Sequence, residues 1–349
     1  MNQDGPPRPS PEGDRLVRVN DETESMQSPK SNPVAWTIGA VVVAFVVLIV
    51  VLYVRAQPPV QQPATQATTD TSPINRATDQ DQRATKDRFG IDFLHRTKPN
   101  GTYWVSSWDK SDRQFDGVDP DDPWFDADHG SAHYTVRNGQ LEISGDVPRM
   151  YVHDPTLKRQ WTDVEITMYF KRVADDSIPF AGMTAVARAN HLKTNDGTDD
   201  PCDTRGYGGR FRYDGHADFE KETRHPRNDS VMNEKIFPNG MPTNEWIGFK
   251  YLVFDREDGV HLELWRDLTD SKNGGDWQRV NTYIDDGHRG FGNVACAPGV
   301  DPAMALTNAS NRLGSESGKP NASVYFRSDG IDTNGLVYKW GSVREIEAE

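Results

Sequence analysis

The chain has 349 residues and a formal net charge of −14, which argues against nucleic acid as a partner because phosphate binding requires a basic patch. Its mean hydropathy of −0.76 is that of a polar chain. Residues 1–34 are rich in Pro, Ser, Asp and Glu and contain few apolar side chains. Such a composition cannot bury a core, so this segment is predicted to be a disordered tail.

Residues 35–54 contain no charge and no proline. About twenty apolar residues in a helix span the roughly 30 Å hydrocarbon core of a bilayer, and Trp36 and Tyr53 stand where aromatic rings favour the headgroups. A cleaved signal peptide would need a short basic leader and a small-residue cleavage site. A buried core helix does not suit so polar a chain. The segment is therefore predicted to be one transmembrane helix, acting as a signal-anchor.

The positive charges around this span predict its orientation. Lys30, Arg18 and Arg15 precede it, whereas Arg55 alone follows it closely, and this bias places the N-terminus in the cytoplasm. Everything after the span is then extracytoplasmic, as in a single-pass type II protein of the cell membrane. Residues 55–88, dominated by Gln, Thr, Pro and Ala, are predicted to be a flexible stalk.

Residues 89–349 are predicted to form one all-β domain, an antiparallel two-sheet jelly-roll sandwich. An Asn-Gly turn between alternating runs marks a hairpin over residues 134–144. Further strands are expected at residues 163–172, 182–189, 209–222, 246–254, 260–266, 277–284, 323–326 and 337–346. The two cysteines, Cys202 and Cys296, lie in this domain, and the sequence is compatible both with a disulfide between them and with two free thiols.

Several of these segments resemble the concanavalin A-like lectin/glucanase superfamily. They are NGQLEISG (residues 138–145) with the following DVEITMYFKR, the hairpin RFRYDGHADFEKE, and the closing YFRSDG and VYKWGSVREI. The superfamily includes laminarinase-type hydrolases, alginate-lyase-type polysaccharide lyases and non-catalytic sugar-binding domains. The resemblance covers most of residues 100–347 and implies a sugar-handling jelly roll, while activity does not follow from fold alone.

The hairpin over residues 207–222 is the richest candidate for chemistry. Asp214-Gly215 favours a two-residue turn, which would pair Tyr213 with His216. Because paired residues share a face, one face would present Tyr207, Phe211, Tyr213, His216, Asp218, Glu220 and Glu222. The opposite face would present Arg210, Arg212, Ala217, Phe219 and Lys221. Rings that stack on sugars beside carboxylates that accept hydroxyl hydrogens would suit a sugar-binding face, and an ordinary solvent-facing strand would also show such alternation.

The carboxylates of this face also suggest catalysis. Neighbouring carboxylates on one strand raise at least one pKa, giving an acid beside a base, and retaining glycosidases need two carboxyl groups about 5–5.5 Å apart. The hydrolases of the superfamily use Glu-x-Asp-x-(x)-Glu, whereas this chain has Asp218-x-Glu220-x-Glu222. The lyases use a histidine, a tyrosine and an arginine, residue types that His216, Tyr213 and Arg210 or Arg212 supply. Lyase and hydrolase activity both remain open, with Glu220, Asp218, Glu222, His216 and Tyr213 as catalytic candidates.

Three further features complete the prediction. Tyr207, Phe211, Arg210 and Arg212 are the expected substrate-binding residues of the hairpin, and Trp265 and Trp340 on later strands are candidate stacking platforms. Trp265 shares its strand face with His261 and Glu263, and Trp340 shares parity with Tyr338.

Asp116, Asp119 and Asp121 fall in an oxygen-rich loop that could hold a structural Ca²⁺, as many members of the superfamily do, although an exposed acidic loop is the simpler reading.

The sequence thus predicts a membrane-anchored, extracytoplasmic protein of the cell surface that binds a polysaccharide or glycan, with lyase or hydrolase activity as an open question. The alternative is a structural or adhesion protein of the cell envelope that uses the same sandwich to bind protein partners.

Overall fold

The computed structural model describes residues 84–127, 132–145, 148–156, 158–174, 181–189, 201–202, 205–224, 227–288, 291, 294–310, 323–328 and 335–348. All of them belong to one compact unit, Asp70–Glu349. The predicted tail, the predicted transmembrane helix of residues 35–54 and nearly all of the stalk lie outside the described residues. Among the residues described, no helix is long and apolar enough to cross a membrane.

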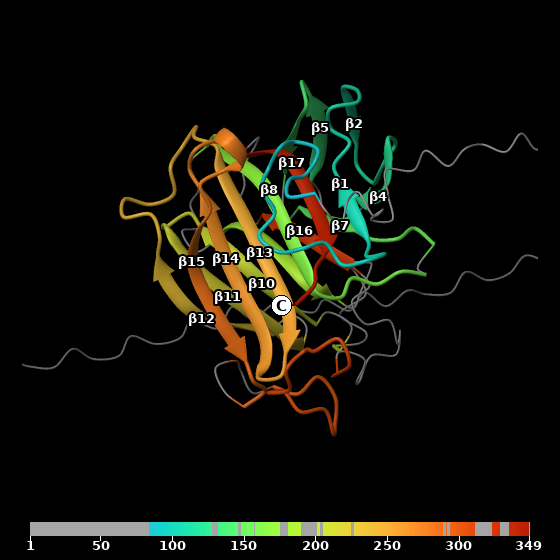
Figure 1. Cartoon of the computed structure of the whole chain (residues 1–349), viewed down its shortest axis with the longest axis vertical. Coiled ribbons are helices and arrows are strands. Elements are labelled where there is room, and N and C mark those ends of the chain that lie inside the picture. The colour runs from blue at the N-terminus through green and yellow to red at the C-terminus, as the bar shows by residue number, and fades with distance from the viewer. Residues whose placement is uncertain are drawn as a thin grey trace, which may run out of the picture. The chain divides into compact units, whose positions relative to one another are not determined.

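The domain is a sandwich of two antiparallel sheets, as predicted (Figure 1). The nine-stranded sheet has the spatial order β15 (Gln278–Asp285), β14 (Gly259–Asp267), β13 (Ile247–Arg256), β8 (Val164–Arg172), β17 (Leu336–Glu345), β6 (Gln140–Ser144), β5 (His133–Arg137) and β2 (Arg113–Phe115), with β1 (Tyr103–Val105) also paired to β17. The eight-stranded sheet has the order β12 (Arg227–Lys235), β11 (His216–Arg224), β10 (Gly206–Arg212), β9 (Gly182–Ala189), β16 (Ser323–Ser328), β7 (Arg149–Val152), β4 (Asp122–Asp126) and β3 (Val118–Asp119).

Within the described part of the chain, the one helical element is a short 3₁₀ turn, η2 (Lys272–Gly274). The strands expected from alternation are present within three residues of their predicted ends. The Asn138-Gly139 turn joins β5 to β6 with both residues at positive φ. This is the backbone that a two-residue hairpin turn requires. The predicted all-β class is therefore confirmed.

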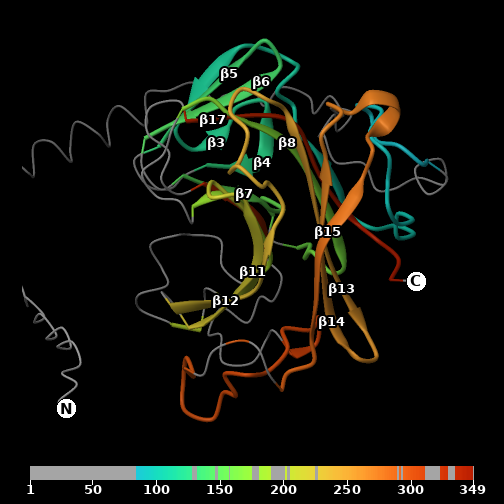
Figure 2. The ribbon, with the colours of Figure 1, turned by 90° about the vertical axis from the view of Figure 1, so that its left-hand side faces the viewer.

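The core lies between the two sheets, which face each other edge-on in Figure 2. Alternate residues of each strand point inward. From the eight-stranded sheet they include Met183, Phe211 and Phe219, and from the nine-stranded sheet Phe249 and Leu262, all fully buried in one cluster. Aromatic contacts join the two sheets, with the Phe211 and Phe249 ring centroids 4.9 Å apart. The sandwich is held together by this shared apolar layer.

The two sheets pack closely at Gly209. A Cβ built on this inward-facing residue would lie 2.7–2.9 Å from ring carbons of Tyr251 on the opposite sheet. Gly209→Ala is therefore expected to lower the free energy of unfolding by about 1–3 kcal/mol, since overpacking a close-packed core forces its neighbours to shift. Gly208→Ala is the matched control, because its Cβ would lie on the outer face, 3.3 Å from the Cβ of Glu220. Chemical denaturation that finds the two variants equally stable would contradict this packing.

The outer face of the nine-stranded sheet carries a buried charge cluster. Glu165 accepts a hydrogen bond from Lys250 Nζ at 2.6 Å and another from Arg344, and the backbone N–H of Leu94 donates to it at 3.1 Å. All three charged residues are at most 1% exposed. The segment of residues 93–97 lies against this cluster through the His95 carbonyl, to which Arg344 donates at 2.6 Å. The N-terminal part of the domain is thereby fixed to the centre of the sheet.

Candidate functional site

The hairpin β10–β11 has a different register from the one predicted. Phe211 pairs with Ala217 and Arg210 with Asp218, so the loop contains three residues, Tyr213, Asp214 and Gly215, instead of two. The Gly215 N–H donates to the Arg212 carbonyl at 2.9 Å, and Gly215 has a φ of 87°. This is the three-residue hairpin in which a type I turn is followed by a left-handed residue.

This one-residue slip exchanges the faces of β10 relative to β11. Tyr207 and Phe211, predicted to bind substrate, are fully buried in the core with Ala217 and Phe219. Arg210 moves to the face of Asp218 and Glu220, the outer face of the sheet. The predicted grouping of aromatic rings with carboxylates on one face of the hairpin is therefore wrong, and the arginines take the place of the rings.

The arginines pair with the carboxylates predicted to be catalytic. Arg210 donates to both oxygens of Asp218, at 2.8 and 2.7 Å, and its Nη1 lies 2.6 Å from Glu220 Oε1. Burial opposes the charge of Arg210, but the two carboxylates outweigh it and raise the pKa of the guanidinium. Arg212 reaches Asp218 at 3.1 Å and Arg327 of β16 reaches Glu220 at 3.7 Å. Asp218 and Glu220 are thus members of an ion-pair network with these three arginines.

Tyr213 and His216 differ in their relation to these carboxylates, since His216 is connected to Asp218 through Asp214 and Arg212. The His216 ring nitrogen Nδ1 is 3.1 Å from Asp214 Oδ1, within the hairpin loop. Tyr213 is buried, with the guanidinium carbon of Arg172 4.8 Å from its ring centroid. Glu222 remains on the outer face and is half-buried. Of the five predicted catalytic residues, the structure brings Asp218, Glu220 and Glu222 to one face, connects His216 to Asp218 through Asp214 and Arg212, and buries Tyr213.

The pairing registers define a row of residues across seven strands of the outer face, which we call the polar row. Its members are Ser230, Glu220, Gly208, Val186, Tyr325, Tyr151 and Asp126, each paired with the next on the neighbouring strand. A second row runs beside it, through Asp218, Arg210, Thr184, Arg327 and Arg149. Small residues, Gly208 and Val186, occupy the middle of the polar row, and carboxylates and tyrosines flank them.

Tyr151 and Tyr325 form the aromatic part of the polar row. Their ring centroids are 5.0 Å apart, and with Val186 and Ala189 they form a small apolar cluster separate from the main core. Burial raises the pKa of both hydroxyls above the usual value, and Glu222 adds to this effect. Both tyrosines therefore stay protonated at neutral pH. Half-buried Arg149, Arg327 and Glu222 lie around them. Phenol, guanidinium and carboxylate groups together can donate and accept hydrogen bonds with neutral polar ligands.

These tyrosines and Arg149 and Arg327 were not among the predicted site residues. In RMYV and SVYFR these residues alternate with Met150 and Phe326, which lie in the core. This alternation is the sequence signal that places them on the outer face. Their proximity to Glu220 depends on β16 lying between β7 and β9. Three strands distant in sequence thus complete the row.

The acidic residues considered for Ca²⁺ have protein partners. Arg113 forms an ion pair with Asp119 and its Nη1 lies 3.4 Å from Asp121. Asp116 lies 3.0 Å from His133. Among the residues that the structure describes, no group of three or more His, Cys, Asp or Glu side chains is arranged to hold a metal ion. Arg113 supplies the positive charge that Ca²⁺ would supply to Asp119 and Asp121.

Trp265 and Trp340 belong to the nine-stranded sheet and lie away from the polar row. Trp265 faces away from the main core, as its parity predicted, packs beside Leu252 and Phe254, and donates from Nε1 to Glu263 at 2.8 Å. Trp340 departs from its predicted parity with Tyr338, which is in the core. A bulge between Lys339 and Ser342, with Trp340 at a φ of 55°, turns its ring toward Tyr169, 5.4 Å away between centroids.

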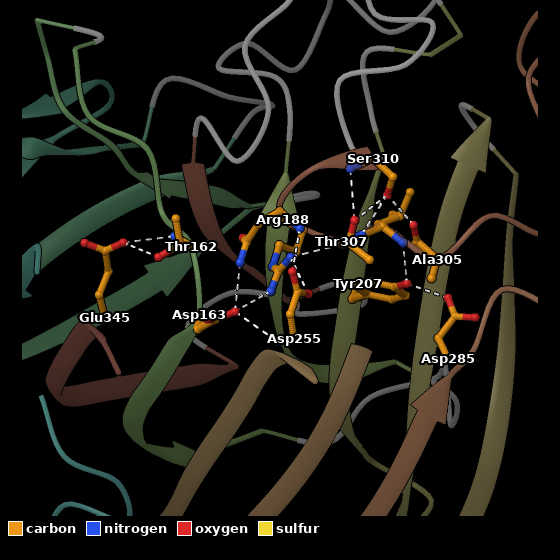
Figure 3. Close-up of polar contacts among 12 residues, drawn as sticks. Thr162, Asp163, Arg188, Tyr207, Asp255, Asp285, Ala305, Thr307, Ser310 and Glu345 are labelled. Carbon is orange, nitrogen blue, oxygen red and sulfur yellow. Dashed lines mark hydrogen bonds and ion pairs between the residues drawn. The ribbon is translucent and has the colours of Figure 1, made fainter. Parts of the chain in front are cut away.

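The two cysteines form a disulfide, one of the two states that the sequence left open. It joins two segments 94 residues apart and has a Cα–Cα distance of 5.0 Å. Cys202 precedes β10, and Cys296 belongs to the segment of residues 294–310 that follows β15. This segment also accepts a hydrogen bond at the Leu306 carbonyl from buried Arg188, which bridges Asp163 and Asp255 (Figure 3).

Comparison with known proteins finds similarity at the level of structure. The exoplasmic/lumenal domain of VIP36, in its Ca²⁺/Man3GlcNAc-bound form, aligns over 70% of this chain and 92% of its own, with 12% identity and a TM-score of 0.40. Carbohydrate-binding module CBM66 from Bacillus subtilis covers 64% and 96%, with 8% identity and a TM-score of 0.37. Lectin II from Ulex europaeus covers 68% and 98%, with 11% identity and a TM-score of 0.36.

No protein-family model and no curated protein matches the chain. The similar structures include a lectin and a carbohydrate-binding module. The TM-scores of 0.36–0.40 and identities of 8–12% establish no function for this chain.

Proposed function

We propose that this protein binds a polysaccharide or glycan on the outer face of the eight-stranded sheet, along the polar row. The observation that carries the proposal is the row itself: two protonated tyrosines, small residues at the centre, arginine side chains along one side and Glu222 on the other. Sugars present many hydroxyl groups, each of which both donates and accepts a hydrogen bond. Tyr151, Tyr325 and Glu220 are at most 5% exposed, so a ligand would meet the row at its half-buried neighbours Glu222, Arg149 and Arg327. Their fixed donors and acceptors suit an extended ligand of this kind.

The proposal is for binding without turnover. Arg210 lies between Asp218 and Glu220 and pairs with both, and this arrangement supports orientation of a ligand instead of proton transfer. A panel of polysaccharides is expected to reveal binding with no shortened or unsaturated product. The anchoring helix of residues 35–54 and the type II orientation are part of the same proposal, and they would hold the row at the cell surface.

A glycan array with the full-length chain in detergent tests the proposal. For the best glycan, Glu222→Gln and Arg149→Ala are each expected to weaken binding about 10- to 100-fold, the effect of losing one hydrogen bond to a charged group. Trp265→Ala is the matched control, because Trp265 lies on the outer face of the other sheet, and it should leave the affinity unchanged. Circular dichroism would verify that each variant is folded. No binding on the array, or loss only with Trp265→Ala, would refute the assignment to this face.

A further inference from the structure

A lysine and an aspartate from opposite sheets meet in the interior of the domain. Lys221 of β11 and Asp285 at the end of β15 are 64 residues apart, and Lys221 Nζ lies 2.6 Å from Asp285 Oδ2. Their side chains are 0% and 1% exposed. Neither residue belongs to the polar row, since Lys221 points inward from β11. Holding two opposite charges away from water has a large desolvation cost, so this pair calls for a physical explanation.

The groups around the pair are arranged about the carboxyl group of Asp285. The Tyr207 hydroxyl donates to Oδ2, the oxygen that also faces Lys221, and the Gly287 N–H donates to Oδ1 at 3.1 Å. Figure 3 shows the Tyr207 side chain directed at Asp285. Aromatic rings line the site: Lys221 Nζ is 5.7 Å from the ring centroid of Tyr207 and 5.4 Å from that of Phe291. The amine is therefore enclosed by rings and held at the carboxyl group.

We propose that Lys221 and Asp285 join in an intramolecular amide bond that links the two sheets covalently. The ammonium of Lys221 first transfers a proton to the carboxylate, which gives a neutral amine and a carboxylic acid. The amine then attacks Cγ of Asp285, while the Gly287 N–H stabilises the charge that develops on Oδ1. The C–N bond forms, the nitrogen gives up one proton, which passes to Oδ2, and the Cγ–Oδ2 bond breaks so that Oδ2 leaves as water. The step needs no oxidant and no cofactor, and it exchanges a buried ion pair for a neutral amide.

Two properties of the site favour this step. Burial lowers the pKa of the Lys221 ammonium, which eases formation of the neutral amine. Burial and the neighbouring Asp285 raise the pKa of Tyr207 well above its usual value, so its hydroxyl remains a proton donor toward the oxygen that leaves. Tyr207 is thereby a positioning and proton-donating group for the bond, in place of the sugar-binding role that the sequence suggested.

A second buried pair in the same domain provides an internal control. Lys250 Nζ also lies 2.6 Å from a carboxylate oxygen, that of Glu165. Burial opposes ionisation of Glu165, but the charges of Arg344 and Lys250 outweigh it and lower its pKa to about 2. A carboxylate held in its charged form resists attack by an amine. Arg344 also pairs with Glu165, whereas the Tyr207 hydroxyl donates to the oxygen of Asp285 that leaves, so the proposed chemistry links only Lys221 with Asp285.

Mass spectrometry of the full-length chain, produced in a host without glycosylation and then reduced and alkylated, tests the proposal. The intact mass is expected to be one water molecule lower than the mass calculated for the sequence with both cysteines alkylated. A tryptic digest should contain one branched peptide joining Lys221 to Asp285 and none joining Lys250 to Glu165. Lys221→Arg, which keeps the charge, should restore the unmodified mass, and Tyr207→Phe should lower the linked fraction.

The unmodified mass in the native chain would overturn the proposal whether or not any variant folds. A branched peptide at both pairs would overturn the assigned chemistry, because it would show that contact alone suffices. Complete linkage in Tyr207→Phe would overturn the role of the tyrosine. Glycan binding is a separate property, and neither a linked nor an unlinked mass bears on the proposed function.

Discussion

Glu165→Gln is expected to lower the free energy of unfolding by about 3–5 kcal/mol, the typical cost of removing one partner from a buried ion pair. Glu165 is enclosed by Lys250 and Arg344, and both cations are at most 1% exposed. A neutral amide would leave two positive charges away from water without an anion. Because domains are stable by only about 5–15 kcal/mol, this one substitution would remove a large share of the stability. Urea denaturation at pH 7 measures it.

The matched control is Asp109→Asn. Asp109 pairs with Arg88 at 2.7 Å, but the two side chains are 50% and 43% exposed. Surface ion pairs contribute about 0–1 kcal/mol, so this variant should unfold almost as the native protein does. Breaking a buried ion pair typically costs several kcal/mol. If Glu165→Gln lowers the free energy of unfolding by less than about 1 kcal/mol, the buried cluster does not hold the N-terminal segment to the sheet.

The same carboxylate gives a pH dependence. The folded-state pKa of Glu165 is lowered from 4.5 to about 2. A lowered pKa means stability that is fully present above pH 4.5 and is lost as the pH falls toward 2. The difference corresponds to about 3 kcal/mol at 1.36 kcal/mol per pKa unit. Denaturation curves between pH 6 and pH 2 should show this loss in the native chain and a smaller loss in Glu165→Gln.

The strands that the sequence predicted are those whose side chains alternate between core and surface, or are buried throughout. Residues 182–189 coincide with β9, and residues 163–172 with β8. In contrast, β12 (RNDSVMNEK) was missed, because this edge strand has no buried residue and hence no apolar period. Charged residues on an exposed edge discourage pairing with other chains. The side chains of this strand are polar because it lies at the edge of the sheet. A search for apolar periodicity does not find a strand of this kind.

The hairpin at residues 207–222 shows why the site could be predicted only in part. The Asp214-Gly215 pair predicts a two-residue turn, and that turn would place Phe211 on the same face as the carboxylates. The structure instead pairs Phe211 with Ala217, so that the apolar residues of both strands enter the core together. Burial of several apolar side chains outweighs a local turn preference. The carboxylates were correctly grouped, but their arginine partners were assigned to the wrong face.

The place of the tyrosines in the polar row depends on the order of the strands in the sheet, which the local sequence pattern does not show. Tyr325 pairs with Tyr151 on one side and with Val186 on the other, and these three residues come from strands that are far apart in the chain. A single sequence shows that each alternates with core residues. It does not show that β16 lies between β7 and β9, and the candidate site follows from that order.

Arg210→Met is the second substitution with a large expected effect, about 3 kcal/mol or more in the free energy of unfolding. Arg210 makes two hydrogen bonds to Asp218 and an ion pair with Glu220, and these carboxylates are 0% and 5% exposed. Without the guanidinium they lose their main counter-charge in the interior. Arg212 and Arg327 retain weaker contacts with them, at 3.1 and 3.7 Å, which places the loss at the lower end of the range for buried pairs.

A charge-neutral triple variant separates this electrostatic effect from lost packing. Arg210→Met combined with Asp218→Asn and Glu220→Gln removes the stranded charges and should recover most of the stability, since whole buried ion clusters are often replaceable where single members are not. Arg210→Lys should fall between the two, because one ammonium cannot reproduce the two-pronged contact with Asp218. A triple variant less stable than Arg210→Met would mean that the arginine acts through its packing. The ion pairs of Arg210 with Asp218 and Glu220 would then contribute little to the stability of the sheet, and the register of the hairpin would rest on the burial of its apolar residues.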